Sequence, residues 1–347
     1  MNFLNSYRRF AHILKFQRVQ QVRTLFSAET LGTNIYQTNC RDALNNVEGA
    51  DQFKWDLHAY VENESTKDSQ KLKNALEVLV HLVKSDSDDV HLIKKTLYAF
   101  DSTDGLTDKA KRSIGNLVMQ YIHSNNMPNV ALDFFSDIKL SEFFAGFKCT
   151  LMLLDLLYIN GQFDKIIEID MENRSKIWSS KTNCSKFLDV LVFGACYKLN
   201  TAESFYYAHK LWSTIEKTSQ FRRSLSFFAA ITLNQGKSTE VIQMLENLET
   251  NFVDEQIKLL ALADVGNVKE IIERVSTWKD NKKLSKHKIS KNVMDGIYQR
   301  VQKNSTADDR KKFQETYNVV IAENGVSIET LEQLLDRTIN SRITIRG

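Results

Sequence analysis

The sequence predicts an all-α protein, a right-handed α-solenoid built from degenerate helix-turn-helix repeats of about 35 residues. The first observation is a recurring turn marked by Gly161, Gly236 and Gly266, each followed five and six residues later by an apolar pair. The second is the near absence of proline, with Pro128 alone in 347 residues. Proline interrupts helices, so its exclusion is typical of a chain built almost wholly of them.

Two fainter copies of the turn extend the array, with Asn126 and Thr201 in the place of the glycine. The steps between turn positions 126, 161, 201, 236 and 266 are 35, 40, 35 and 30 residues. A period of this size indicates stacked helical hairpins, because one hairpin cannot bury its own apolar face. Glycine or asparagine suits the turn, since helices commonly end at a residue with positive φ.

The helices beside the turns carry apolar residues at steps of three and four, which places those residues on one stripe of a helix. The array begins near Ser69 and ends near position 278. Its first stripe comprises Leu72, Leu76, Leu79 and Val83, and the stripe before Gly161 comprises Phe144, Phe147, Leu151, Leu154 and Tyr158.

Residues 1–27 have a different composition and predict a mitochondrial presequence. They contain five basic residues and no acidic residue, and their apolar side chains gather on one side of a helical wheel. An arginine-rich, acid-free amphipathic segment is typical of mitochondrial targeting, and the segment from Arg23 to Ser27 resembles a processing site. A plain basic surface helix is the alternative.

The remaining segments flank the array. Residues 28–68 are polar and lack sustained periodicity, so we expect a poorly ordered approach segment there. Residues 279–347 are predicted to form a basic linker and a helical C-terminal cap, because the open end of a solenoid needs a polar cover. The most apolar stretch, 151–159, is interrupted by Asp155 and is too short to span a membrane.

The charge balance excludes a general electrostatic field for nucleic acid. The chain has 46 basic and 43 acidic residues, and loss of the five basic residues of 1–27 leaves 41 against 43, a net charge of −2. Any basic site must therefore be local. The candidate is the lysine run between positions 279 and 291, which includes Lys282, Lys283 and Lys286. A phosphate-contacting patch and a solvated linker are both compatible with this run.

The sequence predicts no catalytic site, metal site or cofactor, so the protein is not expected to be an enzyme. Its histidines and cysteines show no metal-ligand spacing. Gly236-Lys237-Ser238 resembles the end of a phosphate-binding loop, but the glycine required five residues earlier is Ile231. The acidic group at 86, 88 and 89 stands just before a helix, where capping explains it better than metal binding.

The hairpin period resembles that of the pentatricopeptide repeat family, and Ala195-Cys196-Tyr197-Lys198-Leu199-Asn200 with Glu203-Ser204 resembles a segment of one member. The resemblance implies a mitochondrial matrix protein that binds single-stranded mitochondrial RNA and takes part in transcript maturation, thereby supporting the respiratory chain. In that family RNA lies along the concave face, and a residue ten positions before each turn contacts a base. Those positions here are Asn116, Leu151, Leu191, Ser226 and Gln256.

Asn116, Ser226 and Gln256 are therefore the candidate base-contacting residues, and the lysine run supplies the candidate phosphate contacts. Leu151 and Leu191 cannot hydrogen-bond a base, and we expect both in the core. They favour the alternative function, a protein-docking scaffold in the mitochondrial matrix with RNA-processing or ribosomal proteins as partners. The nearly neutral charge of the chain without its first 27 residues favours it too.

Overall fold

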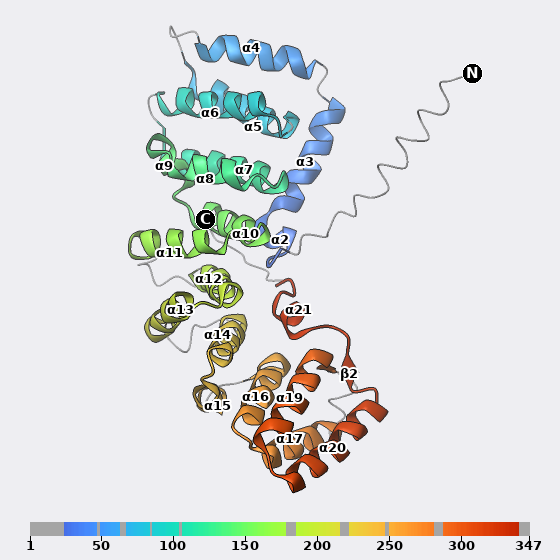
Figure 1. Cartoon of the computed structure of the whole chain (residues 1–347). Helices are drawn as coiled ribbons and strands as arrows, with labels where there is room; N and C mark the ends of the chain where they lie inside the picture. Colours follow the sequence, from blue (N-terminus) through green and yellow to red (C-terminus); the bar gives the residue numbers. More distant parts are fainter. Residues whose placement is uncertain are drawn as a thin grey trace, which may run out of the picture.

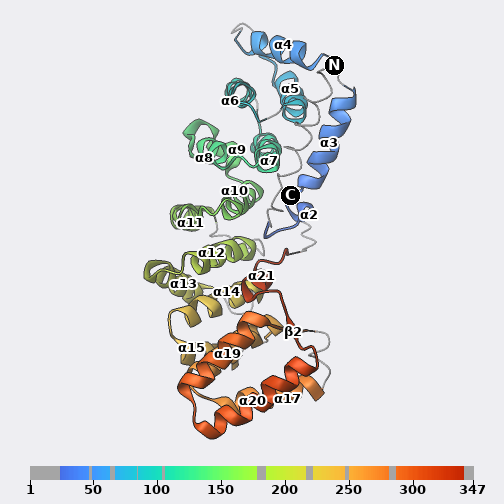
Figure 2. The same ribbon diagram turned by 45° about the vertical axis from the view of Figure 1, so that its right-hand side comes forward.

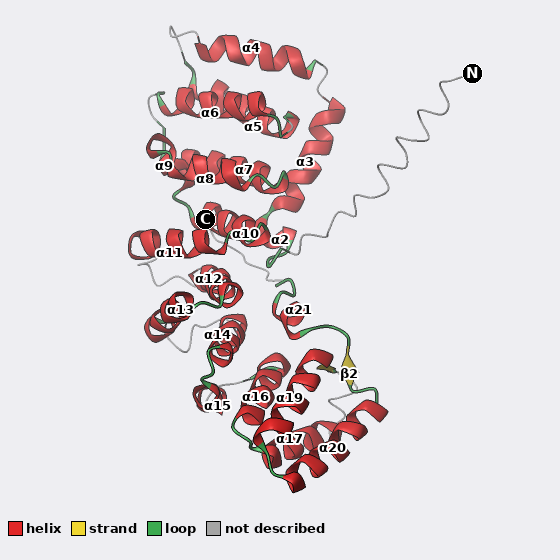
Figure 3. Ribbon diagram, viewed as in Figure 1, coloured by secondary structure: helices red, strands yellow, loops and turns green. Residues whose placement is uncertain are grey.

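The structure is a computed structural model that describes residues 24–46, 49–62, 67–83, 85–103, 106–177, 185–215, 222–246, 250–280 and 287–339. These residues form an elongated stack of α-helices (Figures 1 and 3). The predicted all-α helical-repeat solenoid is confirmed. The described strands are β1 Ile289–Ser290 and β2 Val326–Ser327, which pair in parallel near the C-terminal end.

Successive helices pair as hairpins, and we call the first helix of a pair the A helix and the second the B helix. The A helices pack on one another in one layer and the B helices lie beside them (Figure 2). Short helices η1 Ile138–Leu140 and α9 Ser141–Phe144 are inserted before α10. The pairs are α5 Ser69–Leu82 with α6 Ser87–Asp101, α7 Asp108–Ser124 with α8 Pro128–Ser136, α10 Phe147–Ile159 with α11 Phe163–Ile177, α12 Ser185–Leu199 with α13 Ala202–Thr214, α14 Arg222–Asn234 with α15 Ser238–Glu246, and α16 Phe252–Asp264 with α17 Val268–Asp280.

The A helices form the core of the molecule. Every residue from Cys149 to Tyr158 of α10 is buried, and so is every residue from Phe187 to Cys196 of α12. A helix that is apolar on all sides must be covered on all sides. The B helices cover one face of this layer, so other parts of the chain must cover the opposite face, which we call the A face.

The recurring turn ends the A helices in a left-handed residue. The φ angle is 69° at Gly161 and 74° at both Gly236 and Gly266. The amide of Gln162 donates to the carbonyl of Leu157 at 3.0 Å, and the residues after the other two glycines repeat this bond. This is the Schellman arrangement, which satisfies carbonyls that the helix end leaves without partners.

The asparagine copies of the turn differ from each other. Asn126 has a φ of 52° at its predicted position, whereas in the next faint copy the left-handed residue is Asn200, with a φ of 49°. The prediction of Thr201 as the turn residue was wrong by one position. Thr201 instead caps α13, where its side-chain oxygen accepts from the Ser204 amide at 3.1 Å. Asn200, which ends α12, and Thr201, which caps α13, are adjacent in the sequence. The sequence pattern alone therefore did not distinguish the cap from the turn residue.

Two helix starts are stabilised by residues close to them in the sequence. Pro128 lies in the first turn of α8, where a missing N–H has no cost. Asp86 caps α6, its carboxylate accepting from the amides of Asp88 at 2.8 Å and Asp89 at 3.0 Å. Asp89 also forms an ion pair with Lys54 at 2.7 Å. This acidic group is therefore used in helix capping and packing.

The prediction that residues 28–68 are poorly ordered is corrected, because most of this segment is helical. Helix α2 spans Ala28–Leu31, α3 spans Thr33–Asn46 and α4 spans Ala50–Glu62. Helix α3 crosses α5 and α7, and the hydroxyl of its buried Tyr36 donates to the Val80 carbonyl at 2.7 Å. These helices bury few large side chains, so their apolar periodicity is too weak to detect in the sequence.

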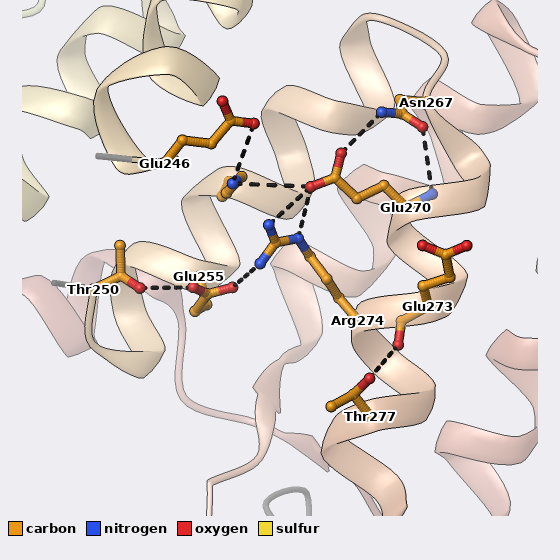
Figure 4. A network of polar contacts seen from close by, with 9 residues as sticks. Glu246, Thr250, Glu255, Asn267, Glu270, Glu273, Arg274 and Thr277 are labelled. Carbon is orange, nitrogen blue, oxygen red and sulfur yellow. Dashed lines mark hydrogen bonds and ion pairs between the residues drawn. The ribbon is translucent and has the colours of Figure 1, made fainter. Parts of the chain in front are cut away.

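Helices α19 Lys291–Asn304 and α20 Ala307–Ala322 form a further pair at the C-terminal end, with α19 on α16 and α20 on α17. Helix α21 Leu331–Leu335 then returns to α14 and α16. A polar network fastens α16 to its neighbours, in which Arg274 donates to Glu270 at 2.9 Å and to Glu255 at 3.0 Å (Figure 4).

Candidate nucleic-acid interface

The predicted base-contacting positions do not line an open surface. Asn116 of α7 is half-buried and its side-chain oxygen accepts from the thiol of Cys149, on α10, at 3.2 Å. Leu151 and Leu191 are 1% and 0% exposed, so both belong to the core as expected.

The prediction that Ser226 and Gln256 contact bases is corrected, because both side chains are buried. They are 1% and 0% exposed. The hydroxyl of Ser226 donates to Asp254 of α16 at 2.5 Å, and the side-chain oxygen of Gln256 accepts from the Ser290 amide at 2.8 Å. At these two positions, ten residues before a turn, the side chain lies against a later segment of the chain and does not reach the surface. Lys282, Lys283 and Lys286 lie outside the described residues.

The two ends of the described chain meet on the A face. Residues 24–27 and 336–339 lie side by side, and we call them the terminal clasp. Phe26 and Ile339 form a parallel bridge, the Ile339 amide donates to the Leu25 carbonyl at 2.9 Å, and the Ser27 amide donates to the Ile339 carbonyl at 3.3 Å. In Figure 1 the adjoining helices, blue α2 and red α21, converge beside the middle of the stack.

A buried carboxylate holds the N-terminal half of the clasp. Asp155 of α10 is 0% exposed, and its Oδ1 accepts from the amides of Leu25 at 3.2 Å and Phe26 at 3.4 Å. Its Oδ2 lies 2.9 Å from Nε2 of His123 on α7. Leu25 and Phe26 are both 0% exposed, and the Phe26 ring lies 5.8 Å from the ring of Phe187 on α12.

The C-terminal half of the clasp is held by three successive A helices. The hydroxyl of Tyr158 donates to Asp336 at 2.8 Å, and Lys198 donates to the other oxygen of Asp336 at 2.6 Å. Arg223 donates to the carbonyl of Leu335 at 2.6 Å. Burial, followed by the nearby Asp336 carboxylate, raises the pKa of Tyr158 well above its ordinary value. The clasp thus occupies the middle of the A face.

Basic side chains recur along one edge of the A layer, where the A helices begin. Lys109, Lys148 and Lys186 are the second residues of α7, α10 and α12, and Arg222 is the first residue of α14. The rings of Phe147 and Phe187 lie 6.5 Å apart, which shows that α10 and α12 begin next to each other. We call these four residues the basic edge.

The basic edge presents charge to solvent. Lys109 and Arg222 are exposed, and Lys148 and Lys186 are half-buried. Neither Lys109 nor Lys148 forms an ion pair with another described residue, whereas the neighbouring Lys111 pairs with Asp101 and Glu142. The positive ends of the helix dipoles point the same way and add to the attraction for anions. Phosphates are the natural ligands of such an edge.

The sequence held signals for both features. Lysine recurs just inside three successive A helices, with steps of 39 and 38 residues, which is close to the period of the turns. Asp155 is the single charge in the run Leu151–Ile159, which is the mark of a buried polar anchor.

Elsewhere in the described part of the chain, no three histidine, cysteine, aspartate or glutamate residues gather as metal ligands would. Nor does any helix there combine the length and apolar character needed to cross a membrane.

Comparison with known proteins gives one consistent result. The chain is 22% identical over 323 residues to pentatricopeptide repeat-containing protein 2, mitochondrial, of Xenopus laevis, which covers 91% of this chain and 82% of that protein. The chain is a distant relative of this protein. The Homo sapiens and Pongo abelii proteins of the same name are 23% and 24% identical, over 80% and 95% of this chain and 71% and 81% of their own.

The likeness to pentatricopeptide repeat-containing protein 2 is not confined to the repeats. Residues 69–278 make up 210 of the 347 positions, so a match over 91% of the chain also includes residues outside them. No protein-family model matches the chain, and no solved structure matches it significantly.

Proposed function

We propose that this protein is a non-enzymatic RNA-binding factor of the mitochondrial matrix that takes part in the maturation or processing of mitochondrial transcripts and so supports the respiratory chain. Its helical repeats and its likeness to proteins named as mitochondrial pentatricopeptide repeat proteins support this proposal. The observation that carries it is the basic edge, because one basic residue at the start of each of four successive A helices matches a polyanion that runs along the stack.

The basic edge favours contacts with the phosphate backbone over contacts with bases. Phosphate contacts position a nucleic acid and bring little sequence information. Of the five positions that lie ten residues before a turn, four are 0% or 1% exposed, namely Leu151, Leu191, Ser226 and Gln256. Only Asn116 is partly accessible. The RNA would thus be held with weak sequence preference and presented to other factors, without a strict code.

The test measures affinity for single-stranded RNA at several salt concentrations. Each phosphate contact on a single strand contributes about 0.7 to the slope of log affinity against log salt, so a Lys109→Gln/Lys148→Gln double variant should lower the slope by about 1.4. The matched control is Lys165→Gln/Lys269→Gln, which removes two exposed lysines from the B helices α11 and α17. Equal slopes for both double variants would count against the basic edge.

A groove formed by B helices favours a second function. This function is the docking of mitochondrial RNA-processing or ribosomal proteins. The groove has a volume of about 810 Å³ and lies between α11 and α13. Its apolar wall includes Met171 and Tyr206, which are 57% and 73% exposed. A Tyr206→Glu variant should then lose a co-purifying partner and keep its RNA affinity. If it loses neither, docking at this groove is wrong.

A further inference from the structure

We propose that the acidic segment Leu331–Asp336, which we call the strap, is an internal competitor of RNA. The strap holds two cations of the A face, Lys198 and Arg223, which RNA phosphates contact once it is displaced. It comprises α21 and the residue that ends this helix. The inference rests on the proposed RNA-binding function and deepens it, because it identifies what limits access to a second set of phosphate contacts next to the basic edge.

The A face and the strap complement each other as a protein and a phosphate backbone do. In their polar contacts the A face supplies donors, namely the Tyr158 hydroxyl, the Lys198 ammonium and the Arg223 guanidinium. The strap supplies acceptors, which are the carboxylates of Glu332 and Asp336 and two carbonyls at the end of α21. Phosphate oxygens are acceptors too, and they bind lysine and arginine readily. The strap therefore offers these side chains what an RNA backbone would offer.

The strap more than neutralises Lys198. The ammonium of this half-buried lysine lies 2.6 Å from a carboxylate oxygen of Asp336 and also pairs with Glu332. Burial by itself would lower the pKa of Lys198, but the hydrogen bonds to Asp336 and Glu332 outweigh it and raise that pKa. One positive charge thus meets two negative ones, and none of it is left to attract RNA.

The strap satisfies Arg223 less completely. Its guanidinium donates to the carbonyl of Leu335 at 2.6 Å and to that of Leu334, and it forms no ion pair within the described part of the chain. Burial lowers the pKa of Arg223, and the carboxylates of Asp254 and Asp336 offset only part of this effect. A phosphate would give the guanidinium a charged, bidentate partner, which the carbonyls do not. Displacement of the strap by RNA is therefore most favourable at Arg223.

The two held cations adjoin the basic edge. Arg223 directly follows Arg222 in α14, and α21 packs against α14 and α16 (Figure 1). Lys198 belongs to α12, which also carries Lys186 of the edge, and α12 packs against α14. An RNA strand that lies on the edge at these two helices reaches the cations of the A face by taking the place of the strap.

The strap stays near its site because the terminal clasp tethers it. Its last residue, Asp336, is the first of the C-terminal clasp residues, and these lie beside residues 24–27. Residues 1–23, the rest of the predicted presequence, lie outside the described residues. The leucines of α21 are buried and add to the hold. A tethered competitor acts at a high effective concentration, so it weakens RNA binding without preventing it.

The first experiment measures the affinity of the full chain for a single-stranded oligouridylate, since phosphate contacts carry little sequence information. Glu332→Gln/Asp336→Asn removes both carboxylates of the strap. The dissociation constant should fall by about 5-fold or more, the lower end of the usual coupling between two sites. The slope of log affinity against log salt should steepen by about 1.4, the contribution of two further phosphate contacts on a single strand.

The matched control is Asp308→Asn/Glu315→Gln, which raises the net charge by the same amount at exposed residues of α20. An equal gain in both double variants would show that net charge alone acts and would overturn the proposal, as would an unchanged affinity of the strap variant. If circular dichroism shows that the strap variant does not fold, Glu332→Gln is compared with Glu315→Gln, and a smaller gain is expected. RNA binding by none of the variants would be the failure of the proposed function, and the competitor would fall with it.

The second experiment follows amide hydrogen exchange in the wild-type chain with and without saturating oligouridylate. RNA that displaces the strap exposes the backbone of α21, so exchange across Leu331–Leu335 should become faster when RNA is bound. Exchange in α21 that is unchanged or slower in the RNA complex would show that the strap stays in place, and this result would overturn the proposal while leaving RNA binding itself intact.

Discussion

Replacing the buried anchor of the terminal clasp tests the architecture most directly. Asp155→Ala in the chain that begins at Thr24 removes a carboxylate that is 0% exposed and that accepts from two backbone amides. The amides of Leu25 and Phe26 would be left buried without an acceptor, and His123 would lose the group 2.9 Å from its Nε2. We expect a large loss of stability.

The expected size follows from these contacts. Each buried amide left without a partner costs about 1–3 kcal/mol. The substitution also relieves the cost of burying the carboxylate, which offsets part of the loss. The net effect should be about 3–5 kcal/mol, within the roughly 2–6 kcal/mol that two such amides represent. At roughly 2–4 °C per kcal/mol, the midpoint of thermal unfolding should fall by about 6–20 °C.

The assay is a double-mutant cycle followed by urea unfolding and circular dichroism. Asp155→Ala is measured in the chain that begins at Thr24 and in the chain that begins at Ala28, which lacks both amides. The cost should be smaller in the shorter chain by about 1–3 kcal/mol, the coupling expected of groups in direct contact. Asp133→Ala is the control, because Asp133 is exposed and pairs with Lys94 at 2.7 Å on the surface. It should cost less than about 1 kcal/mol.

One outcome would refute the reasoning outright. If Asp155→Ala costs the same in both chains, its carboxylate does not hold the N-terminal segment, and the clasp contacts have no energetic weight.

Three further predictions concern other parts of the fold. Gly161→Ala should cost about 1–2 kcal/mol for its left-handed backbone alone, because a Cβ there meets no atom within 4 Å. Ser226→Ala should cost about 1–3 kcal/mol by depriving Asp254 of a partner and should leave RNA affinity unchanged. Asp170, whose pKa burial raises to about 6, makes its favourable contribution when protonated, so the wild type should lose stability relative to Asp170→Asn as the pH rises from 4 to 7.

Each of these has its own control and contrary result. Gly146→Ala lies at a φ of −78° with equally open space and should change stability by less than about 0.5 kcal/mol, so equal costs at both glycines would rule out backbone strain. Loss of RNA binding by folded Ser226→Ala would restore that residue as a base contact. The carboxyl groups of Asp170 and Asp189 share the single guanidinium of Arg174. When both are ionised, one negative charge is left uncompensated. A wild type that gains stability relative to Asp170→Asn as the pH rises from 4 to 7 would contradict the raised pKa.

The architecture could be predicted because its signals are local. The turn glycines act through their own backbone, and Pro128 and Asp86 act within one helical turn. The spacing of the turns is visible in the sequence without any tertiary contact being known. The error at Thr201 arose at the same scale, since helix stops and helix caps use overlapping residue types.

The site could not be predicted in the same way because its geometry is set by distant contacts. Ser226 and Gln256 have the polarity of a base contact, yet α16 and β1 cover them from 28 and 34 positions away. A periodic pattern shows which side of a helix is apolar and does not show which polar residues a later segment will bury. The helices at 28–62 escaped prediction for the related reason that they rely on partners in α5, α6 and α7.

The terminal clasp also affects how the chain reaches its final state. Thr24 and Thr338 are 314 positions apart, yet their groups meet. An ordinary solenoid, whose repeats contact only their neighbours, folds outward from any point and frays from either end. Here the first residues of the fold must wait for the last ones, so a chain that emerges N-terminus first holds Leu25 and Phe26 without their final partner until synthesis is almost complete. Truncation at either terminus should therefore weaken the middle of the stack first.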